Sequence, residues 1–580
     1  MKHTRRNPKI VFIALLLLAT VLVTSLSVLT VSAAETTTAT GSSAATYDAG
    51  KAYYRANYDT LANAETIVYQ SITWEEAVYL FQQRGNYLIL LGGQWCGNTT
   101  AVIDYINNAA VEAGVSTIYN LDLRLDGENA SSHIRETNGK NETGSTYNYL
   151  YGELVTKYLT NLNDWVEYTV DSDYKLTYTN ADGVNVTVPK VQVPFLFLYN
   201  KDNTEDHSGK NSGYRTTYPI VYGYEKMLFR DADGNLYSSY NKTDDTKVTD
   251  YTAQLNTAIF SHIGTGEGQV ELSSFTDADY IRLSYNEKAG QTIFAKNDQI
   301  NIRTLTYHQL KWLLGQEGNY LILFGGSWCG NTQAVIDIIN DYAVKNNVTV
   351  YNFDTKLDGG YAKSQWGYTK DLHIRDSANV FASLYVDLVN TYLDNIETEY
   401  DKATNNIYYL SDPADETSKV IANKLQVPYF FAYNKDTVDN DGHDIPILGY
   451  VEKMYSLKAT RDDYIGKEAN YTAYTSATFA VLQAYAAKAG ITAQNIVTAE
   501  TSTNGGGDDS QNTNTDTNTN TDTNTNTNND SDSGTDQEES KNSNVGKIVA
   551  AIIGGVVVIG VVVAVVILNQ KKKSSGGAAD

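Results

Sequence analysis

Cysteine is almost absent from this chain of 580 residues, which holds two, Cys96 and Cys329. Two cysteines in so long a chain cannot make a disulfide framework, so its folded parts must be stabilised by apolar cores. Basic residues are also few, since 44 Lys and Arg stand against 68 Asp and Glu, for a net charge of −24. This balance argues against nucleic acid as a partner, because phosphate backbones are bound by Lys and Arg.

Several sequence signals of function are missing as well. No group of His, Cys and Asp has the spacing of metal ligands, and there is no Gly-rich phosphate loop, so we expect no metal and no cofactor. No Leu-Pro-x-Thr-Gly signal precedes the C-terminal apolar run, and no lipid-accepting cysteine follows the N-terminal one. These absences favour a membrane anchor over attachment to a cell wall.

What the chain does contain is one segment present twice. Residues 86–108 read NYLILLGGQWCGNTTAVIDYINN and residues 319–341 read NYLILFGGSWCGNTQAVIDIIND, with 18 of 23 positions identical. In each copy an apolar run ends in Gly-Gly, the cysteine follows, and apolar residues then recur at helical spacing. This pattern predicts a strand, a turn that carries the thiol, and a helix that begins at the thiol.

The two ends of the chain predict an exported, membrane-anchored protein. Residues 1–34 combine a basic start, an apolar run and small residues, which is typical of a signal peptide; an uncleaved anchor is the alternative. Residues 496–546 are rich in Asn, Thr and Asp and are expected to be a disordered linker. The apolar residues 547–568 are long enough to span the plasma membrane, and the lysines after them place the tail, 569–580, in the cytoplasm. The rest is then extracellular.

Residues 35–268 and 269–495 are predicted to form two domains, because the repeats are offset by 233 residues. Strands alternate with helices in both, which predicts the α/β class with a central mixed sheet flanked by helices. The first domain is expected to contain strands at 67–71, 87–91, 117–123, 195–199 and 220–224, a hairpin at 170–188, and helices at 73–83 (with a Thr73–Glu76 capping box), 147–162 and 251–262. The second is expected to contain helices at 306–314, 380–396 and 474–486 and strands at 320–324, 349–353, 429–433 and 445–450.

The order of these elements and two motifs resemble the thioredoxin-like superfamily. The motifs are Trp-Cys-Gly at residues 95–97 and 328–330, and Val-Pro at 193–194 and 427–428, directly before a strand. The resemblance implies two tandem thioredoxin-like domains whose prolines have cis peptide bonds and face the cysteines. It implies Cys96 and Cys329 as catalytic residues. The implied substrate-binding residues are Trp95, Gly97, Thr99, Pro194, Trp328, Gly330, Thr332 and Pro428.

The chain departs from the superfamily at two places in each copy. Thr99 and Thr332 replace the second cysteine of the Cys-x-x-Cys motif, and leucines replace a buried acid six residues before the first. A cysteine at a helix N-terminus is still favoured as thiolate, and the Thr hydroxyl one turn on is expected to donate to the sulfur. Two functions stay open: thiol–disulfide exchange or thiol capture on exported or surface proteins, and non-catalytic surface binding or adhesion. A Cys96–Cys329 disulfide would require the two turns to face each other.

Other repeated residues allow more than one interpretation. The Leu-Asp-Gly segments at 125–127 and 357–359 are expected to be turns, with substrate orientation or Ca²⁺ binding as the alternative. His133 and His373 are expected to be solvated or helix-start residues, with a role as base for the thiol as the alternative. Many of the 45 tyrosines are expected to be exposed. The sequon at Asn98 would place a glycan over the thiol, so a reactive thiol there predicts a bacterial source.

Overall fold

The computed structural model describes residues 49–128, 132–136, 147–166, 174–210, 215–238, 247–400, 404–454 and 468–490. The predicted signal peptide, polar linker, membrane helix and tail lie outside the described residues. Among the helices that are described, none is long and apolar enough to cross a membrane. By its internal contacts the chain divides into two units, Met1–Thr503 and Asn504–Asp580, and all described residues belong to the first.

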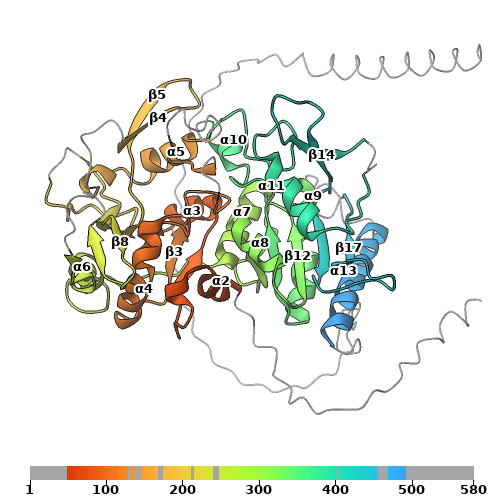
Figure 1. Cartoon of the computed structure of the whole chain (residues 1–580), viewed down its shortest axis with the longest axis horizontal. Helices are drawn as coiled ribbons and strands as arrows, with labels where there is room; N and C mark the ends of the chain where they lie inside the picture. The colour runs from red at the N-terminus through yellow and green to blue at the C-terminus, as the bar shows by residue number, and fades with distance from the viewer. Residues whose placement is uncertain are drawn as a thin grey trace, which may run out of the picture. The chain divides into compact units, whose positions relative to one another are not determined.

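The first repeat is built on a five-stranded mixed sheet in the order β1-β3-β2-β6-β7. Its strand β3 is labelled in Figure 1. The first three strands of this order are parallel, and the last two are antiparallel to their neighbours. Every residue of β2 and β6 is buried, as expected for central strands with helices on both faces. The strands are β1 (Tyr69–Ser71), β2 (Tyr87–Leu91), β3 (Ile118–Leu121), β6 (Phe195–Tyr199) and β7 (Ile220–Glu225).

The second repeat has a sheet of the same order, β11-β13-β12-β16-β17, with the same strand directions. The chain is therefore a mixed α/β protein with two like sheets. The four central strands match their sequence prediction residue for residue. The strands of the second sheet are β11 (Ile302–Thr304), β12 (Tyr320–Phe324), β13 (Val350–Phe353), β16 (Tyr429–Tyr433) and β17 (Ile447–Val451).

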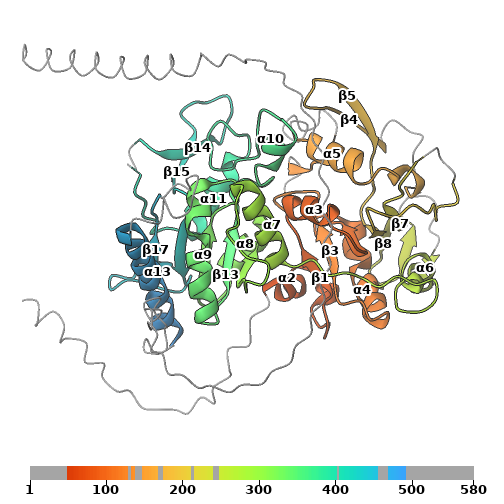
Figure 2. The ribbon, with the colours of Figure 1, turned by 180° about the vertical axis from the view of Figure 1, so that it is seen from behind.

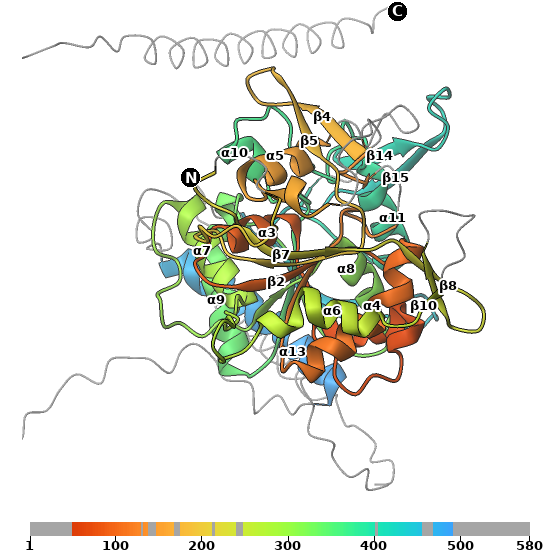
Figure 3. The same ribbon diagram turned by 90° about the vertical axis from the view of Figure 1, so that its left-hand side faces the viewer.

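Helices cover both faces of the first sheet. Figure 3 shows α4 and α6 on one side of β2 and β7 and α3 on the other. Alternate residues of β2 accordingly enter different cores: Leu88 packs with Ile103 of α4, and Ile89 packs with Val78 of α3. The predicted capping box of α3 is present. The predicted helices are α3 (Trp74–Phe81), α4 (Gly97–Glu112), α5 (Tyr149–Lys157), α6 (Tyr251–Ala258), α8 (Tyr307–Leu314), α9 (Gly330–Lys345), α11 (Ala382–Tyr392) and α13 (Glu468–Ala489).

Each repeat also carries a two-stranded hairpin beside a helix (Figure 2). The hairpin predicted at 170–188 is present as β4–β5 (Lys175–Thr179, Asn185–Pro189) and contacts α5, and β14–β15 (Asn406–Leu410, Lys419–Asn423) contacts α11. The elements that the sequence analysis missed are β11, β14 and β15, α2 (Ala49–Asn57), α7 (Asp277–Ala289), α10 (Tyr361–Gln365), and the three-stranded sheet of β8 (Leu228–Arg230), β9 (Leu236–Ser238) and β10 (Lys247–Val248).

The two repeats contact each other through like groups. The Tyr53 hydroxyl of α2 hydrogen-bonds His308 Nδ1, on α8 of the second repeat, at 3.0 Å. The Tyr280 hydroxyl of α7 donates to Glu75, on α3 of the first repeat, at 2.8 Å. Glu75 and His308 hold the same position in equivalent helices, and Lys288 of α7 forms a buried ion pair with Glu75. The contact therefore has approximate two-fold symmetry.

The tyrosines of this contact belong to a second repeated motif. Tyr-x-Arg-x-x-Tyr begins at Tyr53 and again at Tyr280, and in both copies the arginine donates to two backbone carbonyls of the following loop. All four motif tyrosines are buried. More than half of the chain's 45 tyrosines are buried. The expectation that many tyrosines are exposed is therefore wrong for most of them.

Candidate thiol site

Each cysteine lies at the N-cap of the helix that follows the central strand. Cys96 has φ −96° and ψ 112° before α4, and Cys329 has φ −94° and ψ 113° before α9. The Cys96 N–H donates to the Gly93 carbonyl at 3.1 Å, and its carbonyl accepts from the Thr100 N–H at 3.0 Å. The predicted arrangement of strand, turn and helix, with the thiol at the start of the helix, is confirmed in both repeats.

Each thiol faces the valine that precedes the proline. The Cys96 thiol donates to the Val193 carbonyl oxygen at 3.4 Å, and the Cys329 thiol donates to the Val427 carbonyl oxygen at 3.4 Å. The peptide bonds to Pro194 and Pro428 are cis, as the resemblance implied. Both cysteines are free, and they keep 7% and 8% of their surface exposed. The thiols are thus recessed in the same way in both copies.

Cys96 lines a cavity of about 310 Å³ that opens to the surface beside the Val-Pro segment. The cavity is basic on one side, where Lys190 and Arg135 lie, and it holds the side chain of Gln192. Within the described part of the chain, the buried Nε2 atom of Gln192 has no hydrogen-bond partner. A group with hydrogen-bond acceptors, or an acidic group, would therefore be favoured next to this sulfur.

Three polar side chains hold the segment before the proline in place. Arg135 donates to the Val191 carbonyl, the Tyr151 hydroxyl accepts from the Val191 N–H at 2.8 Å, and the Glu225 carboxylate accepts from the Gln192 N–H at 2.6 Å. The sequence analysis missed this role, although Lys-x-Gln-Val-Pro and Glu-Lys-Met recur in both copies. In the second repeat the same contacts join Arg375, Tyr385 and Glu452 to Leu425 and Gln426.

The tryptophan before each cysteine is fixed by an aspartate from the end of the neighbouring strand. Trp95 Nε1 donates to Asp122 Oδ1 at 2.7 Å, the Arg124 guanidinium lies 4.0 Å from the ring centre, and the His133 ring packs edge-on at 4.8 Å. A Cβ at Gly93 would lie 2.1 Å from Asp122 Oδ2, so this turn requires glycine. The equivalents in the second repeat are Trp328, Asp354, Lys356, His373 and Gly326.

Burial governs the charge of these groups. It raises the pKa of Asp122 and of Asp354 to about 7, against the opposing hydrogen bond from Trp Nε1. Burial, followed by nearby Arg135, lowers the pKa of His133 to about 2, and the equivalent effects lower that of His373 to about 3. His133 is therefore a neutral, buried residue that contacts Trp95, and not the solvated loop residue that we expected.

The threonines in place of the second cysteine do not reach the sulfur. Thr99 and Thr332 are fully buried, and their hydroxyls have no hydrogen-bond partner among the residues that the structure describes. A Cβ on Gly92 would lie 3.0 Å from the Thr99 hydroxyl oxygen, because this side chain packs under the turn. The expected hydrogen bond from threonine to sulfur is therefore wrong. Of the other predicted residues, Gly97 and Gly330 begin the helices, Trp95 and Trp328 are half-buried, and Pro194 and Pro428 are buried beside the thiols.

The Leu-Asp-Gly segments form turns, as predicted. Gly127 and Gly359 have φ of +76° and +61°, which favours glycine. The Asp358 carboxylate accepts from the backbone N–H groups of Gly360 and Leu372, and burial raises its pKa to about 6. Both hydrogen bonds go to Oδ1 of Asp358 and come from its own loop.

One exposed loop of the second repeat gathers potential metal ligands. Within the described part of the chain, Asp439, Asp441 and His443 are the residues whose ligand atoms all lie within 4.8 Å of one another. The Asp439 carboxylate already accepts two backbone N–H groups of its own turn. The turn itself therefore explains why these three side chains lie close together.

Comparison with known proteins adds little to this geometry. No protein-family model matches the chain, and no curated protein matches it. Among solved structures it is similar to one described as "Crystal structure of ERdj5 form I", with 10% identity, over 72% of this chain and 31% of that chain, and with a TM-score of 0.13. The chain thus spans less than a third of that protein. A likeness at this TM-score carries no argument, so function must be inferred from the chain's own residues.

Proposed function

We propose that residues 35–268 and 269–495 are thioredoxin-like domains of a membrane-anchored extracellular protein. Through single cysteines this protein carries out thiol–disulfide exchange or thiol capture on exported or surface proteins. The observation that carries the proposal is the placement of each sulfur at a helix N-cap, against the carbonyl before a proline. The signal-like residues 1–34 and the apolar run at 547–568 support the location.

The exchange step needs one cysteine only. The Cys96 thiolate attacks one sulfur of a client disulfide, a mixed disulfide forms, and the other client sulfur leaves as a thiolate. The step moves one disulfide bond without net oxidation. Release requires a second thiol, which the client or a small thiol supplies, because Thr99 stands where a resolving cysteine would stand.

The sulfur of Cys96 lies at a helix start and beside basic side chains. Cys96 is the N-cap residue of α4, and Lys190 and Arg135 line the same cavity as Cys96. Arg135, Tyr151 and Glu225 hold the segment before Pro194 in place, and this segment leads to the carbonyl that the thiol faces. A client segment in this cavity would meet the sulfur from the side of Val193.

The proposal is tested by iodoacetamide alkylation and by mixed-disulfide formation, with Cys96→Ser and Cys329→Ser variants of the full chain to separate the two thiols. We expect each cysteine to be alkylated in the folded protein. A mixed disulfide with a model client should form in the parent and disappear in the double serine variant. Absence of this adduct in the parent, or its persistence in the double serine variant, would contradict the proposal.

The second candidate is a non-catalytic binding or adhesion protein. It is favoured by the burial of both sulfurs, which retain less than a tenth of their surface, and by the lack of a second cysteine. On this alternative the double serine variant keeps every interaction of the parent with its ligands. Loss of client binding in that variant, with the fold intact, excludes it.

A further inference from the structure

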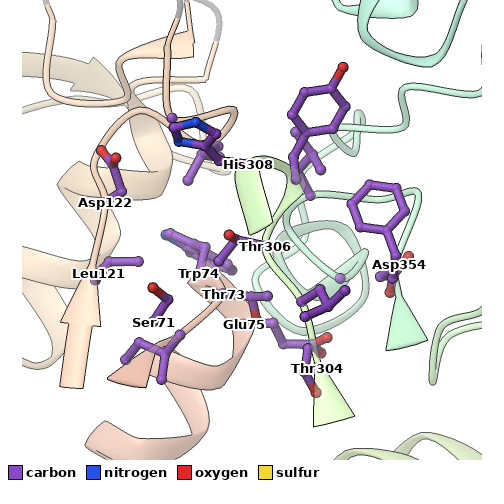
Figure 4. Close-up of a pocket in the computed structure, with 18 of the residues that line it drawn as sticks. Ser71, Thr73, Trp74, Glu75, Leu121, Asp122, Thr304, Thr306, His308 and Asp354 are labelled. Atoms are coloured by element: carbon purple, nitrogen blue, oxygen red, sulfur yellow. The ribbon is translucent and has the colours of Figure 1, made fainter. Parts of the chain in front are cut away.

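Two cavities beside the first thiol are large enough to hold part of another molecule. The cavity lined by Cys96 measures about 310 Å³, and a second cavity, here named the helix-start cavity, measures about 650 Å³. By contrast, the cavity drawn in Figure 4, with Asp122 and Asp354 on opposite sides, measures about 50 Å³, which is room for about three to five water molecules. The thiol turn of the first repeat therefore offers space for the side chains of a partner.

The two cavities meet at the start of helix α4. Asn98, in the first turn of this helix, lines both of them. Cys96 lines the first cavity and its neighbour Gly97 lines the second, where a Cβ added to Gly97 would meet nothing within 4 Å. A chain segment that brings a sulfur atom to Cys96 can therefore continue past Gly97 into the helix-start cavity.

One short segment forms a wall of both cavities. Met227 lines the first cavity, and Phe229 and Arg230 of strand β8 line the helix-start cavity. The strand β8 lies beside α4 (Figure 3). It is fixed there because Leu228 is buried in the core and the Arg230 guanidinium donates to the Ala101 carbonyl of α4 at 2.7 Å. The two cavities are thus parts of one groove between this segment and the start of α4.

Phe229 presents an apolar surface to this groove. Its side chain is 40% exposed, and it is the one aromatic among the large apolar side chains that are exposed in the described part of the chain. Its ring stacks on that of Tyr237, its partner on strand β9, with 5.4 Å between the ring centres. A ring that is already held in place loses little conformational entropy when a partner packs on it, so more of the contact energy remains for binding.

Polar side chains surround Phe229 in the helix-start cavity. Asn57, Thr60, Gln94 and Thr100 contribute hydrogen-bond donors and acceptors to its lining. An extended peptide has backbone N–H and C=O groups that such side chains can bind, and it can place one large side chain against the Phe229 ring. The groove therefore fits a peptide segment better than a wholly apolar molecule.

The sequence of the second repeat differs at this position. Counted from the repeated Glu-Lys-Met segment, Ser456 stands where Phe229 stands in the first repeat. The methionine itself is common to both repeats, and the Asn331 amide at the start of α9 lies 3.3 Å from the sulfur of Met454. A methionine beside the helix start is thus a feature of both repeats, whereas the aromatic ring belongs to the first.

We propose that the first thiol site binds its client as an extended segment along this groove. Phe229 selects clients that carry an aromatic or large aliphatic side chain a few residues from the reactive sulfur. Selection of this kind rests on the proposed thiol exchange, because the client lies in the groove while its sulfur reacts at Cys96. Phe229 takes no part in the covalent step and acts by contact with the client alone.

Selection by Phe229 is tested in the full chain carrying Cys329→Ser, in which Cys96 is the one thiol. The probes are short peptides with one cysteine, activated as its 2-pyridyl disulfide, and one phenylalanine placed at different distances before or after it. The Cys96 thiolate attacks the peptide sulfur, the peptide–Cys96 disulfide forms, and pyridine-2-thiolate leaves, takes up a proton and is measured by its absorbance. We expect the best phenylalanine peptide to react about tenfold faster than the same peptide with serine in that place, because part of an aromatic side chain is buried.

Variants at Phe229 complete the test. Phe229→Ser should reduce the ratio of the two rates to about one, whereas Phe229→Leu should keep most of it, because an apolar surface remains. The matched control, Val184→Ser, removes an exposed apolar side chain between β4 and β5 and should keep the parent's ratio. Equal rates for phenylalanine and serine peptides at every placement, or an unchanged ratio in Phe229→Ser, would overturn selection by Phe229 and leave the exchange itself intact. No reaction with any peptide would instead overturn the exchange, and this selection with it.

Discussion

The two repeats keep the same thiol turn but differ in what covers the helix behind it. In the first repeat α4 packs against α6 and β8, and Arg230 of β8 donates to the Ala101 carbonyl and to Asp104. In the second repeat α9 packs against the 22-residue helix α13. The chemistry of the turn therefore depends on the central strand, the helix start and the proline loop, and the outer covering is free to vary.

The repeats also differ where they contact each other. The first contributes Glu75, an acid paired with Lys288, and the second contributes His308 at the same position. Burial lowers the pKa of His308, so this half of the contact is a neutral hydrogen bond. The contact made through Glu75 and the contact made through His308 should thus differ in strength, and variants of the residues involved measure the difference.

The largest effect is expected for Lys288→Ala. It leaves Glu75 buried without its cation, and loss of one partner of a buried pair costs about 3–5 kcal/mol. Lys311→Ala is the matched control, because Lys311 forms an exposed ion pair with Glu128, again between the repeats, worth about 0–1 kcal/mol. Urea unfolding followed by circular dichroism measures both. Equal losses would mean that burial does not distinguish the two pairs.

Next in size is the pH dependence of Asp122→Asn and Asp354→Asn. A carboxyl whose folded pKa is raised to about 7 stabilises the fold fully below its unfolded value of ~3.9, and this stability is lost as the pH rises to about 7. Each asparagine variant should therefore be as stable as the parent near pH 4. At pH 8 its free energy of unfolding should exceed that of the parent by at most ~4 kcal/mol. Thermal midpoints measured from pH 4 to pH 8 give the comparison. Similar curves for the two variants would show that the aspartates are equivalent across the repeats.

A smaller effect is expected for Gly93→Ala and Gly326→Ala. The added Cβ would meet the paired aspartate and tryptophan of its own repeat, and overpacking of this kind costs about 1–3 kcal/mol. Tryptophan fluorescence should shift as the indole is displaced. Gly97→Ala, at the start of α4 where a Cβ has nothing within 4 Å, is the control and should keep the parent's stability and spectrum.

The smallest effect compares the two tyrosine hydroxyls of the contact. Tyr53→Phe removes a hydrogen bond to a neutral imidazole, worth about 1 kcal/mol, and Tyr280→Phe removes one to a buried carboxylate, worth about 2 kcal/mol. Chemical unfolding of both variants under the same conditions measures the difference. A larger loss for Tyr53→Phe would reverse our ranking of the two halves.

The sequence predicted the elements whose signal is local. The central strands are short apolar runs bounded by Asn and Gly, and α3 begins with a capping box, so their limits follow from residues within a few positions. The helix α7 was missed because its charged and aromatic residues show little helical periodicity: it is held by contacts to α3 and β11. The contacts with α3 join residues about 200 positions apart, and no local pattern encodes them.

The candidate site was predicted to a similar extent. Recurrence in both copies marked Cys96, Asp122 and His133, and the structure brings the last two together at Trp95. The direction of the Thr99 side chain was wrong because it depends on packing under the turn. Glu225 was missed although Glu-Lys-Met is repeated, since its role needs the approach of Gln192 from the loop before β6.

The Glu75–Lys288 ion pair favours contact between the two different repeats over contact between two copies of the same repeat. Counted from the Tyr-x-Arg-x-x-Tyr motif, the first repeat has Leu61 where the second has Lys288, so two first halves would bury Glu75 against leucine. Two second halves would set Lys288 against an uncharged imidazole. The contact surface therefore favours pairing of one repeat with the other over pairing of two identical repeats. Because both repeats belong to one chain, each always has the other available.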